Sequence, residues 1–193
     1  MPWEKSFSRV EALTLAEHKF WETGYAATSM ESLLETMGIQ KGSFYATFGS
    51  KHQVYIEALD HYIAERFKQF DASLSASSPR QALLEHIEAV LNESLRRRSD
   101  RGCFLVNAAL ELSPHDPEVR RVVERALDRH WKFYETMLGM ARDLGEVPAD
   151  LDPVQTSSSM LGLVLGIRVM ARQGVPSTVI TQVANGLRAM IAK

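Results

Sequence analysis

The segment between Gly38 and Gly49 constrains the fold more than any other part of the sequence, because its apolar residues are spaced as on a helix but the segment is very short. At 100° per residue, Phe44 and Phe48 share one face, and the opposite face carries small and polar residues. We expect this apolar face to pack on the apolar residues of the preceding helix, from Met30 to Met37. The sequence therefore predicts a short helix, supported from one side and exposed on the other.

A second helix precedes this segment directly. Its apolar residues recur at i, i+3, i+4 and i+7, which is the pattern of one helix face: Met30, Leu33, Leu34 and Met37. Thr28 or Ser29 can cap its start, and Gly38 ends it. A helix, a short turn and a second brief helix form a helix-turn-helix, whose second member enters the major groove of DNA.

Helix caps and glycine stops recur along the rest of the chain, and strand signals are nearly absent. We expect an all-α fold of about nine helices, near residues 8–23, 29–37, 41–47, 50–71, 78–98, 102–112, 116–144, 152–173 and 177–193. The Ser-rich stretch ASLSASSPR marks the expected domain boundary. Residues 1–50 would form a three-helix DNA-binding domain, joined by a helix over about 51–71 to a larger helical domain over 72–193.

The overall charge of the chain does not indicate nucleic-acid binding. The net charge is −2, and residues 1–51 hold five Lys and Arg against six Glu. DNA binding must therefore depend on where the cations lie. With Cys103 as the only cysteine, no internal disulfide can form, which is typical of the cytoplasm. The longest apolar run, Met160–Ile167, fits a buried helix, so we expect no membrane association.

The outward face of the short helix suits DNA. Gly42, Ser43 and Ala46 are small enough to let the helix backbone approach base edges, and its first N–H groups can face phosphates. Ser50 followed by Lys51 places a cation beside a capped helix start, which is a phosphate-binding arrangement.

Residues Leu13 to Tyr62 resemble the DNA-binding domain of the TetR family of bacterial transcriptional regulators. The residues that carry the resemblance stand in order over this stretch: Phe20, Gly24-Tyr25, Ala27 to Met30, Gly38 to Tyr45, and Phe48 to Lys51. The resemblance implies that base contacts come from Lys41, Gly42, Ala46 and Thr47. It implies phosphate contacts from Thr28, Ser29, Ser43, Tyr45 and Lys51.

Several of these positions have an alternative interpretation. Tyr45 could be a half-buried core residue, and Thr28 and Ser29 could be helix caps only. Lys5 and Arg9 could reach the DNA backbone, although solvated charges are the default expectation.

The resemblance implies that the larger domain dimerises and encloses a small-molecule pocket. Gly162 and Gly166, four residues apart, would let another helix approach closely. Two helices from each chain would form a four-helix interface. The candidate interface residues are Gly162, Gly166, Val179, Val183, Leu187 and Met190; the alternative is that these helices form the core of a monomer.

Aromatic, soft and isolated polar side chains are candidates for the pocket: Cys103, Phe104, Asn107, Trp131, Tyr134, Met137 and Met160. Cys103 follows four arginines and stands near an expected helix start, and both favour a thiolate. The stretch also resembles TetR-type proteins that include sensors of electrophiles and oxidants. A buried apolar filler is the other interpretation of this cysteine.

Enzyme and metal motifs are absent from the sequence, including a nucleophile elbow, a phosphate-binding loop and a zinc-type Cys pair. His61 and Glu65 have i, i+4 spacing but no evident third ligand. We therefore expect a homodimeric regulator, and specifically a repressor, that binds a palindromic operator and is released by a small-molecule effector. We expect no cofactor and no metal. The alternatives are a thiol-based sensor of the same fold, a constitutive DNA-binding dimer, and an all-α enzyme or interaction module.

Overall fold

The computed structural model describes residues 7–74, 78–96 and 101–193, and these residues form nine α-helices and no strand. The helices are α1 (Arg9–Thr23), α2 (Met30–Met37), α3 (Lys41–Phe48), α4 (Lys51–Leu74), α5 (Pro79–Ser94), α6 (Phe104–Glu111), α7 (Pro117–Asp143), α8 (Pro153–Arg172) and α9 (Ser177–Met190). The expected all-α fold and its helix order are confirmed.

The helix starts lie where the sequence places its caps. The hydroxyl of Ser8 accepts from the N–H of Glu11, Ser29 does the same for Ser32, and Ser78 for Gln81. Asp116 and Asp152 each accept from two N–H groups in the following turn. These side chains satisfy N–H groups that have no partner within the helix, and so they decide where each helix begins.

Helix ends differ from expectation by a few residues. Helix α4 continues to Leu74 rather than residue 71, and α6 begins at Phe104 rather than residue 102, with Cys103 in the N-cap position. Cys103 makes no side-chain cap hydrogen bond. The expected end of α5 within RRRSDRG falls partly on residues 97–100, outside the described residues, and the helix itself ends at Ser94.

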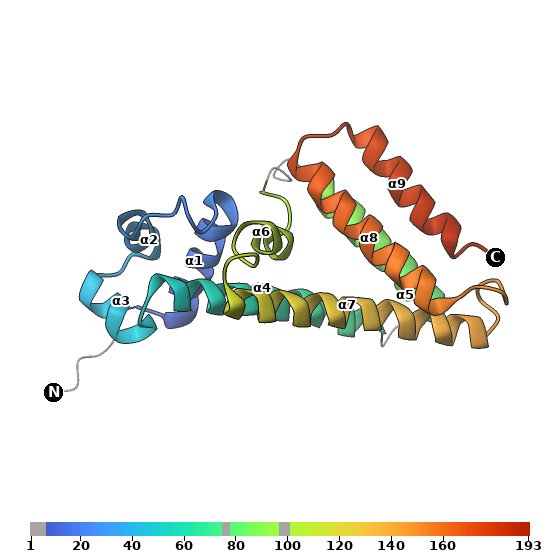
Figure 1. The fold of residues 1–193 in the computed structure, drawn as a ribbon, viewed down its shortest axis with the longest axis horizontal. Coiled ribbons are helices and arrows are strands. Elements are labelled where there is room, and N and C mark those ends of the chain that lie inside the picture. The colour runs from blue at the N-terminus through green and yellow to red at the C-terminus, as the bar shows by residue number, and fades with distance from the viewer. Residues whose placement is uncertain (1–6, 75–77, 97–100) are drawn as a thin grey trace.

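The helices form an elongated molecule, in which α4 and α7 run side by side along the long axis (Figure 1). Helices α1 to α3 lie at one end. At the other end, α5 and α8 pack on the far half of α7, and α9 packs on α5 and α8. Helix α6 lies between these two groups and contacts α4, α7 and α8.

Two apolar clusters hold the fold together. The first joins α1 to α4 with α6 and the first half of α7, around Phe20, Phe44, Tyr55 and Phe104. The second joins α5, the second half of α7, α8 and α9. The first cluster crosses the boundary expected from the sequence, because α6 and α7 complete the core on which the N-terminal helices pack.

Helix α8 is, within the described part of the chain, the one helix long and apolar enough to cross a membrane by length and composition. It contacts α5, α6, α7 and α9, and Met160, Val164 and Ile167 lie in the second cluster. One face of α8 therefore packs in this core, whereas Gly162 of the Met160–Ile167 run is exposed, so the run is buried only in part.

Candidate DNA-binding surface and effector cavity

A tight turn joins α2 to α3. Gly38 has a left-handed backbone with φ of 65°, a conformation that favours glycine. Its N–H donates to the carbonyl of Glu35, and the N–H of Ile39 donates to that of Leu34, both at 3.2 Å. The side chain of Ile39 is buried. The turn provides hydrogen-bond donors for the last carbonyls of α2, and it changes the chain direction between α2 and α3.

Helix α3 is supported from one side only. Phe44 and Phe48 are 0% and 3% exposed, with ring centroids 5.8 Å apart. On the opposite face, the exposed side chains are Lys41, Ser43, Tyr45 and Ala46, with the backbone of Gly42 among them and Thr47 half-buried. Tyr45 is 45% exposed, which excludes the core interpretation for this residue.

The start of α3 is open. Gln40 occupies the N-cap position without a side-chain hydrogen bond, so the N–H groups of the first turn receive no cap from it. A Cβ added at Gly42 would meet no atom within 4 Å. This end of α3 can therefore approach a phosphate or a base edge at short range.

The first turn of α4 is capped by Ser50 and carries a cation, Lys51. The Ser50 hydroxyl accepts from the N–H of Gln53 at 3.1 Å. Lys51 is half-buried, and its Nζ lies 4.3 Å from the ring centroid of Tyr25. Burial lowers the Lys51 pKa, and the carboxylate of Glu111 opposes part of that shift. The ring holds the ammonium near the turn between α1 and α2.

At the start of α2, the position of Thr28 does not fit the phosphate contact expected for it. Thr28 is 1% exposed, and its hydroxyl donates to the carbonyl of Gly24 at 2.6 Å and lies 2.7 Å from the Thr23 hydroxyl. These bonds turn the side chain inward and use its hydroxyl proton, so the proton is not available to donate to a phosphate oxygen. Ser29 is exposed and caps α2 through the N–H of Ser32.

Arg9 lies beside this surface. Its guanidinium is 5.0 Å from the Phe48 ring centroid and pairs with Glu57 at 2.5 Å. The pairing occupies the group that could otherwise reach DNA. Lys5 lies outside the described residues.

Three contacts that the sequence analysis missed tie the larger domain to the DNA-binding helices. Glu111, the last residue of α6, accepts from the backbone N–H groups of Tyr25 and Ala26 at 3.1 and 2.9 Å. Asp116 caps α7 with one oxygen, and its other oxygen lies 2.6 Å from Nε2 of His52 on α4. The third is a hydrogen bond from the Trp21 indole to the carbonyl of Gly102 at 3.1 Å. Only Asp116 carried a sequence signal, as a helix cap.

A cavity of about 60 Å³ lies between α4, α5, α6, α7 and α8. Its wall is mostly apolar and also includes Tyr62, His86, Cys103, His130, Arg66 and Arg168. A wider hollow of about 500 Å³ shares Tyr62, Arg66 and Arg168 with the cavity and is further lined by Glu93.

Glu93 joins two arginines at this junction. Its Oε2 lies 2.7 Å from Nη2 of Arg168, and its Oε1 pairs with Nη1 of Arg66. Burial raises the Glu93 pKa, but the two guanidiniums outweigh burial and hold it below its ordinary value. The carboxylate is therefore ionised, and the cluster has one excess positive charge.

Two histidines in the cavity wall are neutral at physiological pH. Burial lowers the pKa of His130 to about 4, and the charges of Arg168 and Arg129 add to the shift. Burial also holds the pKa of His86 well below its ordinary value, with His130 and Arg168 acting in the same direction. The hydroxyl of Tyr134 lies 2.7 Å from Nε2 of His86.

The structure places one of the expected pocket residues, Cys103, in this wall. Cys103 is half-buried, and its Sγ accepts from the Tyr62 hydroxyl at 3.5 Å. Burial, with Cys103 nearby, raises the pKa of Tyr62 and keeps its hydroxyl a donor.

The other expected pocket residues do not line this cavity. Phe104 packs in the first core against Tyr55 and Tyr62, and the second core holds Tyr134, Met137 and Met160. These side chains fill space because the helix face that carries them points into a core. The Asn107 amide donates to the carbonyl of Arg101, and its side chain lines a separate hollow. Trp131 donates from its indole to the Ser158 hydroxyl at 3.1 Å.

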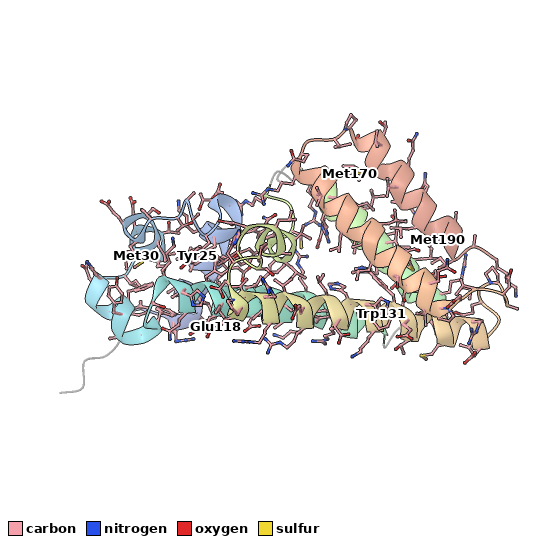
Figure 2. The ribbon with its side chains drawn as sticks, viewed as in Figure 1. Tyr25, Met30, Glu118, Trp131, Met170 and Met190 are labelled. Carbon is pink, nitrogen blue, oxygen red and sulfur yellow. The ribbon has the colours of Figure 1, made fainter. Side chains whose placement is uncertain are left out.

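The α8 and α9 surface corrects part of the expected dimer interface. Gly162 is exposed, Gly166 is half-buried and Val179 is 39% exposed, but Leu187 is fully buried in the core of its own chain. Val183 and Met190 are partly buried against the same core. The face of α9 that points outward instead carries Gln182, Gly186 and Ala189. Figure 2 shows Met170 and Met190 at this end and Tyr25 and Met30 at the other.

His61 and Glu65, which have the spacing of a metal-binding pair, contact different partners. His61 Nδ1 lies 2.6 Å from Oε2 of Glu17 on α1, and Glu65 pairs with Lys68. The first contact joins α4 to α1, and the second is an exposed ion pair within α4.

Comparisons with known proteins agree with this geometry. Residues 12–58 match the family model described as bacterial regulatory proteins, tetR family, and residues 79–185 match the tetracyclin repressor-like C-terminal domain. The transcriptional repressor ComR of Escherichia coli is 27% identical over 94% of this chain and 87% of its own length. The uncharacterised regulator YezE of Bacillus subtilis is 31% identical over 74% of each protein.

Solved structures have the same fold. A cysteine variant of the regulator CifR, bound to a 26-base-pair operator, superposes with a TM-score of 0.84 at 27% identity, over 96% of this chain and 97% of that one. Reduced Escherichia coli NemR has a TM-score of 0.86 at 20% identity, over 95% and 96%, which supports the fold alone. Since one family model spans more than half of the sequence and the other covers its helix-turn-helix, this chain belongs to the TetR family of bacterial transcriptional regulators.

Proposed function

We propose that this chain is a ligand-responsive, sequence-specific DNA-binding regulator of transcription, and that it acts as a repressor in the cytoplasm. The observation that carries the proposal is the exposed face of α3. Its residues contribute no core packing, whereas the buried phenylalanines on the opposite side hold the helix rigidly outward. Such a face is suited to the major groove. The named relatives ComR and CifR are, respectively, a transcriptional repressor and a regulator bound to its operator.

In this proposal, Lys41, Gly42, Ala46 and Thr47 face bases. Phosphates are bound by Ser29, Ser43, Tyr45 and Lys51, and Thr28 instead holds the turn before α2. Lys41 can donate to guanine, and the methyl groups of Ala46 and Thr47 can meet a thymine methyl. Few of these side chains make bidentate contacts, so DNA shape contributes to specificity.

We also propose a homodimer formed through α8 and α9. The exposed face of these helices is open at Gly162 and Gly186, where an added Cβ would meet nothing within 4 Å. Close helix packing by a second copy would cover this face. Two recognition helices could then reach half-sites about 34–36 Å apart on a palindromic operator.

The cavity supports an effector rather than a constitutive DNA-binding dimer, for which a packed core is expected. Cys103 at the start of α6 lies in the cavity wall, and Glu111 at the end of α6 binds the turn between α1 and α2. A ligand that displaces α6 would therefore move the DNA-binding helices relative to the larger domain. A coupling of about 1–3 kcal/mol is enough to change operator occupancy by 5- to 150-fold.

The direct test is an electrophoretic mobility shift and fluorescence-anisotropy titration with palindromic DNA from upstream of this protein's own gene and its neighbours. We expect salt-sensitive binding of one dimer per palindrome, with random DNA bound more weakly by a factor of at least about 10³. Equal affinity for palindromic and random DNA would contradict sequence-specific regulation. An all-α enzyme or interaction module would show no salt-sensitive DNA binding.

A thiol-based sensor is the second candidate, because Cys103 is half-buried in the cavity wall. Maleimide labelling tests it. Rapid labelling of the native protein that releases operator DNA would support the sensor, and Cys103→Ser should abolish the release. Labelled protein that still holds DNA would exclude it.

A further inference from the structure

The cavity beneath α6 combines an apolar wall with an uncompensated positive charge. Arg66 and Arg168 are its charged wall residues, and none of the described residues that line it is acidic. Apolar side chains such as Val90, Leu161 and Val164 form most of the remainder. An apolar chamber with cations at one side is suited to a ligand that has a hydrophobic body and an anionic head.

The two arginines share one carboxylate. The side chains of Arg168, Arg66 and Glu93 are 16%, 27% and 23% exposed, so their charges are only partly screened by solvent. Glu93 faces the wider hollow, whereas both guanidiniums also line the cavity. Each guanidinium has five N–H donors and contacts Glu93 through one Nη, so donors remain for a second carboxylate.

The histidines in the wall leave this charge balance unchanged. Because the pKa values of His86 and His130 lie well below neutrality, neither adds a positive charge to the wall. A ligand with one negative charge would match the single excess positive charge. A cation placed here would be both desolvated and repelled.

The volume of the cavity limits the size of the ligand. A cavity of about 60 Å³ holds only a few heavy atoms, since one water occupies at least about 10–15 Å³ by the same measure. The wider hollow reaches the same two arginines, Arg66 and Arg168, and provides access from solvent.

We propose that the effector is a compact monocarboxylate, with its short apolar body in the cavity and its carboxylate bound by Arg66 and Arg168. This inference rests on the proposed function, because it names the class of molecule that the regulator senses. The carboxylate binds the donors that Glu93 leaves free, and its negative charge weakens the attraction of the two guanidiniums for Glu93. Binding therefore loosens the link between α5 and α8 and acts on Tyr62 and Cys103 in the same wall.

Isothermal titration calorimetry on the purified full chain, without DNA, tests the proposal. The ligands are propionate, butyrate and isovalerate, each compared with its amide, and butylammonium serves as the cation of similar size. We expect at least one carboxylate to bind about 10- to 100-fold more tightly than its amide, the effect of losing a charge-assisted hydrogen-bond pair. Binding of no carboxylate, equal binding of the amides, or preference for butylammonium would overturn the proposal.

Two substitutions should shift affinity in opposite directions. Arg168→Gln should weaken carboxylate binding by about 10-fold or more, whereas Glu93→Gln frees both guanidiniums and should strengthen it. The matched control is Arg188→Gln, because Arg188 joins α9 to Glu88 of α5 through a similar ion pair away from the cavity. It should leave the affinity unchanged. Weaker binding in a folded Glu93→Gln variant would contradict the assignment even if Arg168→Gln did not fold.

Operator release by the same carboxylates, measured by anisotropy, distinguishes the proposed effector class from the proposed DNA-binding function. A protein that binds operator but no carboxylate would refute the effector class and leave the regulator intact. A protein that binds the carboxylate but no DNA would refute the proposed function instead.

Discussion

The carboxylate of Glu111, at the end of α6, accepts a hydrogen bond from the backbone N–H of Tyr25 at 3.1 Å, and so joins the larger domain to the turn between α1 and α2. The other oxygen of Glu111 accepts from Ala26. Gly24 makes this approach possible, since a Cβ there would lie 2.8 Å from Glu111. The contact connects the cavity wall to the DNA-binding helices through one short helix.

Glu111→Ala should therefore loosen this turn. We expect a loss of about 1–2 kcal/mol in the free energy of unfolding, because two N–H groups lose a charged acceptor at a partly exposed site. Amide hydrogen exchange at Tyr25 and Ala26 should accelerate. Glu124→Ala, at an exposed position on α7, is the control and should change neither. Unchanged exchange at both amides would show that the hydrogen bonds do not hold the turn.

Lys41 and Lys51 should have separable roles. Lys51→Ala should weaken binding to all DNA about equally and reduce the slope of log affinity against log salt by about one, since one phosphate contact is lost. Lys41→Ala should reduce the preference for operator over random DNA by about 1–3 kcal/mol. Anisotropy titrations at several salt concentrations measure both. If the two variants behave identically, the assignment of base and phosphate contacts is wrong.

Gly42→Leu should separate folding from DNA binding. Space around Gly42 is open, and leucine favours a helix over glycine by about 0.5–1 kcal/mol, so the melting temperature should hold or rise. The added side chain should keep α3 from the base edges and abolish operator binding. Gly139→Leu on α7, another open helical glycine, should still bind the operator. Operator binding by Gly42→Leu at its original affinity would exclude close approach at this position.

The proposed dimer depends on close packing at Gly162. Gly162→Arg meets no atom of its own chain within 4 Å, so the monomer should fold while the pairing of α8 and α9 is blocked. Sedimentation velocity should show a monomer, and operator affinity should fall because one recognition helix must bind alone. Gly139→Arg should remain dimeric. A dimeric Gly162→Arg would place the interface elsewhere.

Stability should decrease as the pH falls below the ordinary histidine pKa of 6.5. The folded pKa of His130 is about 4, so the unfolded chain binds a proton between these values while the folded chain does not. Folding therefore loses stability as pH falls through this window, by about 3 kcal/mol at most for this residue. Glu93, with its lowered pKa, adds an effect only below its ordinary value of 4.5.

His130→Gln isolates this contribution, because glutamine does not titrate. Its denaturation midpoint should vary less between pH 6.5 and 4.5 than that of the natural chain. The remaining dependence should include His86, whose pKa is also lowered. Identical pH profiles for the two proteins would mean that His130 is already protonated in the folded state near pH 6.

The helix-turn-helix could be predicted because its signals are local. Gly38 ends α2 through its own backbone conformation, and the spacing of Phe44 and Phe48 already defines the buried face of α3. Helix starts at Ser8 and Asp152 follow from side chains that bond to N–H groups two or three residues away. Each of these features involves residues within one or two helical turns.

The larger domain was less predictable, because helices such as α6 and α8 are apolar on more than one side. Whether Tyr134 fills a core or lines a cavity depends on how α5, α7 and α8 cross, and the same uncertainty placed Leu187 on the wrong face of α9. The Glu93 cluster joins α4, α5 and α8 across 27 and 75 residues of sequence. The sequence alone determined where most helices begin and which short helix has an exposed face, because caps, glycines and spacing act within a few residues. Only the tertiary structure decided the cavity, its charge and the contact from Glu111, because these arise where distant helices meet.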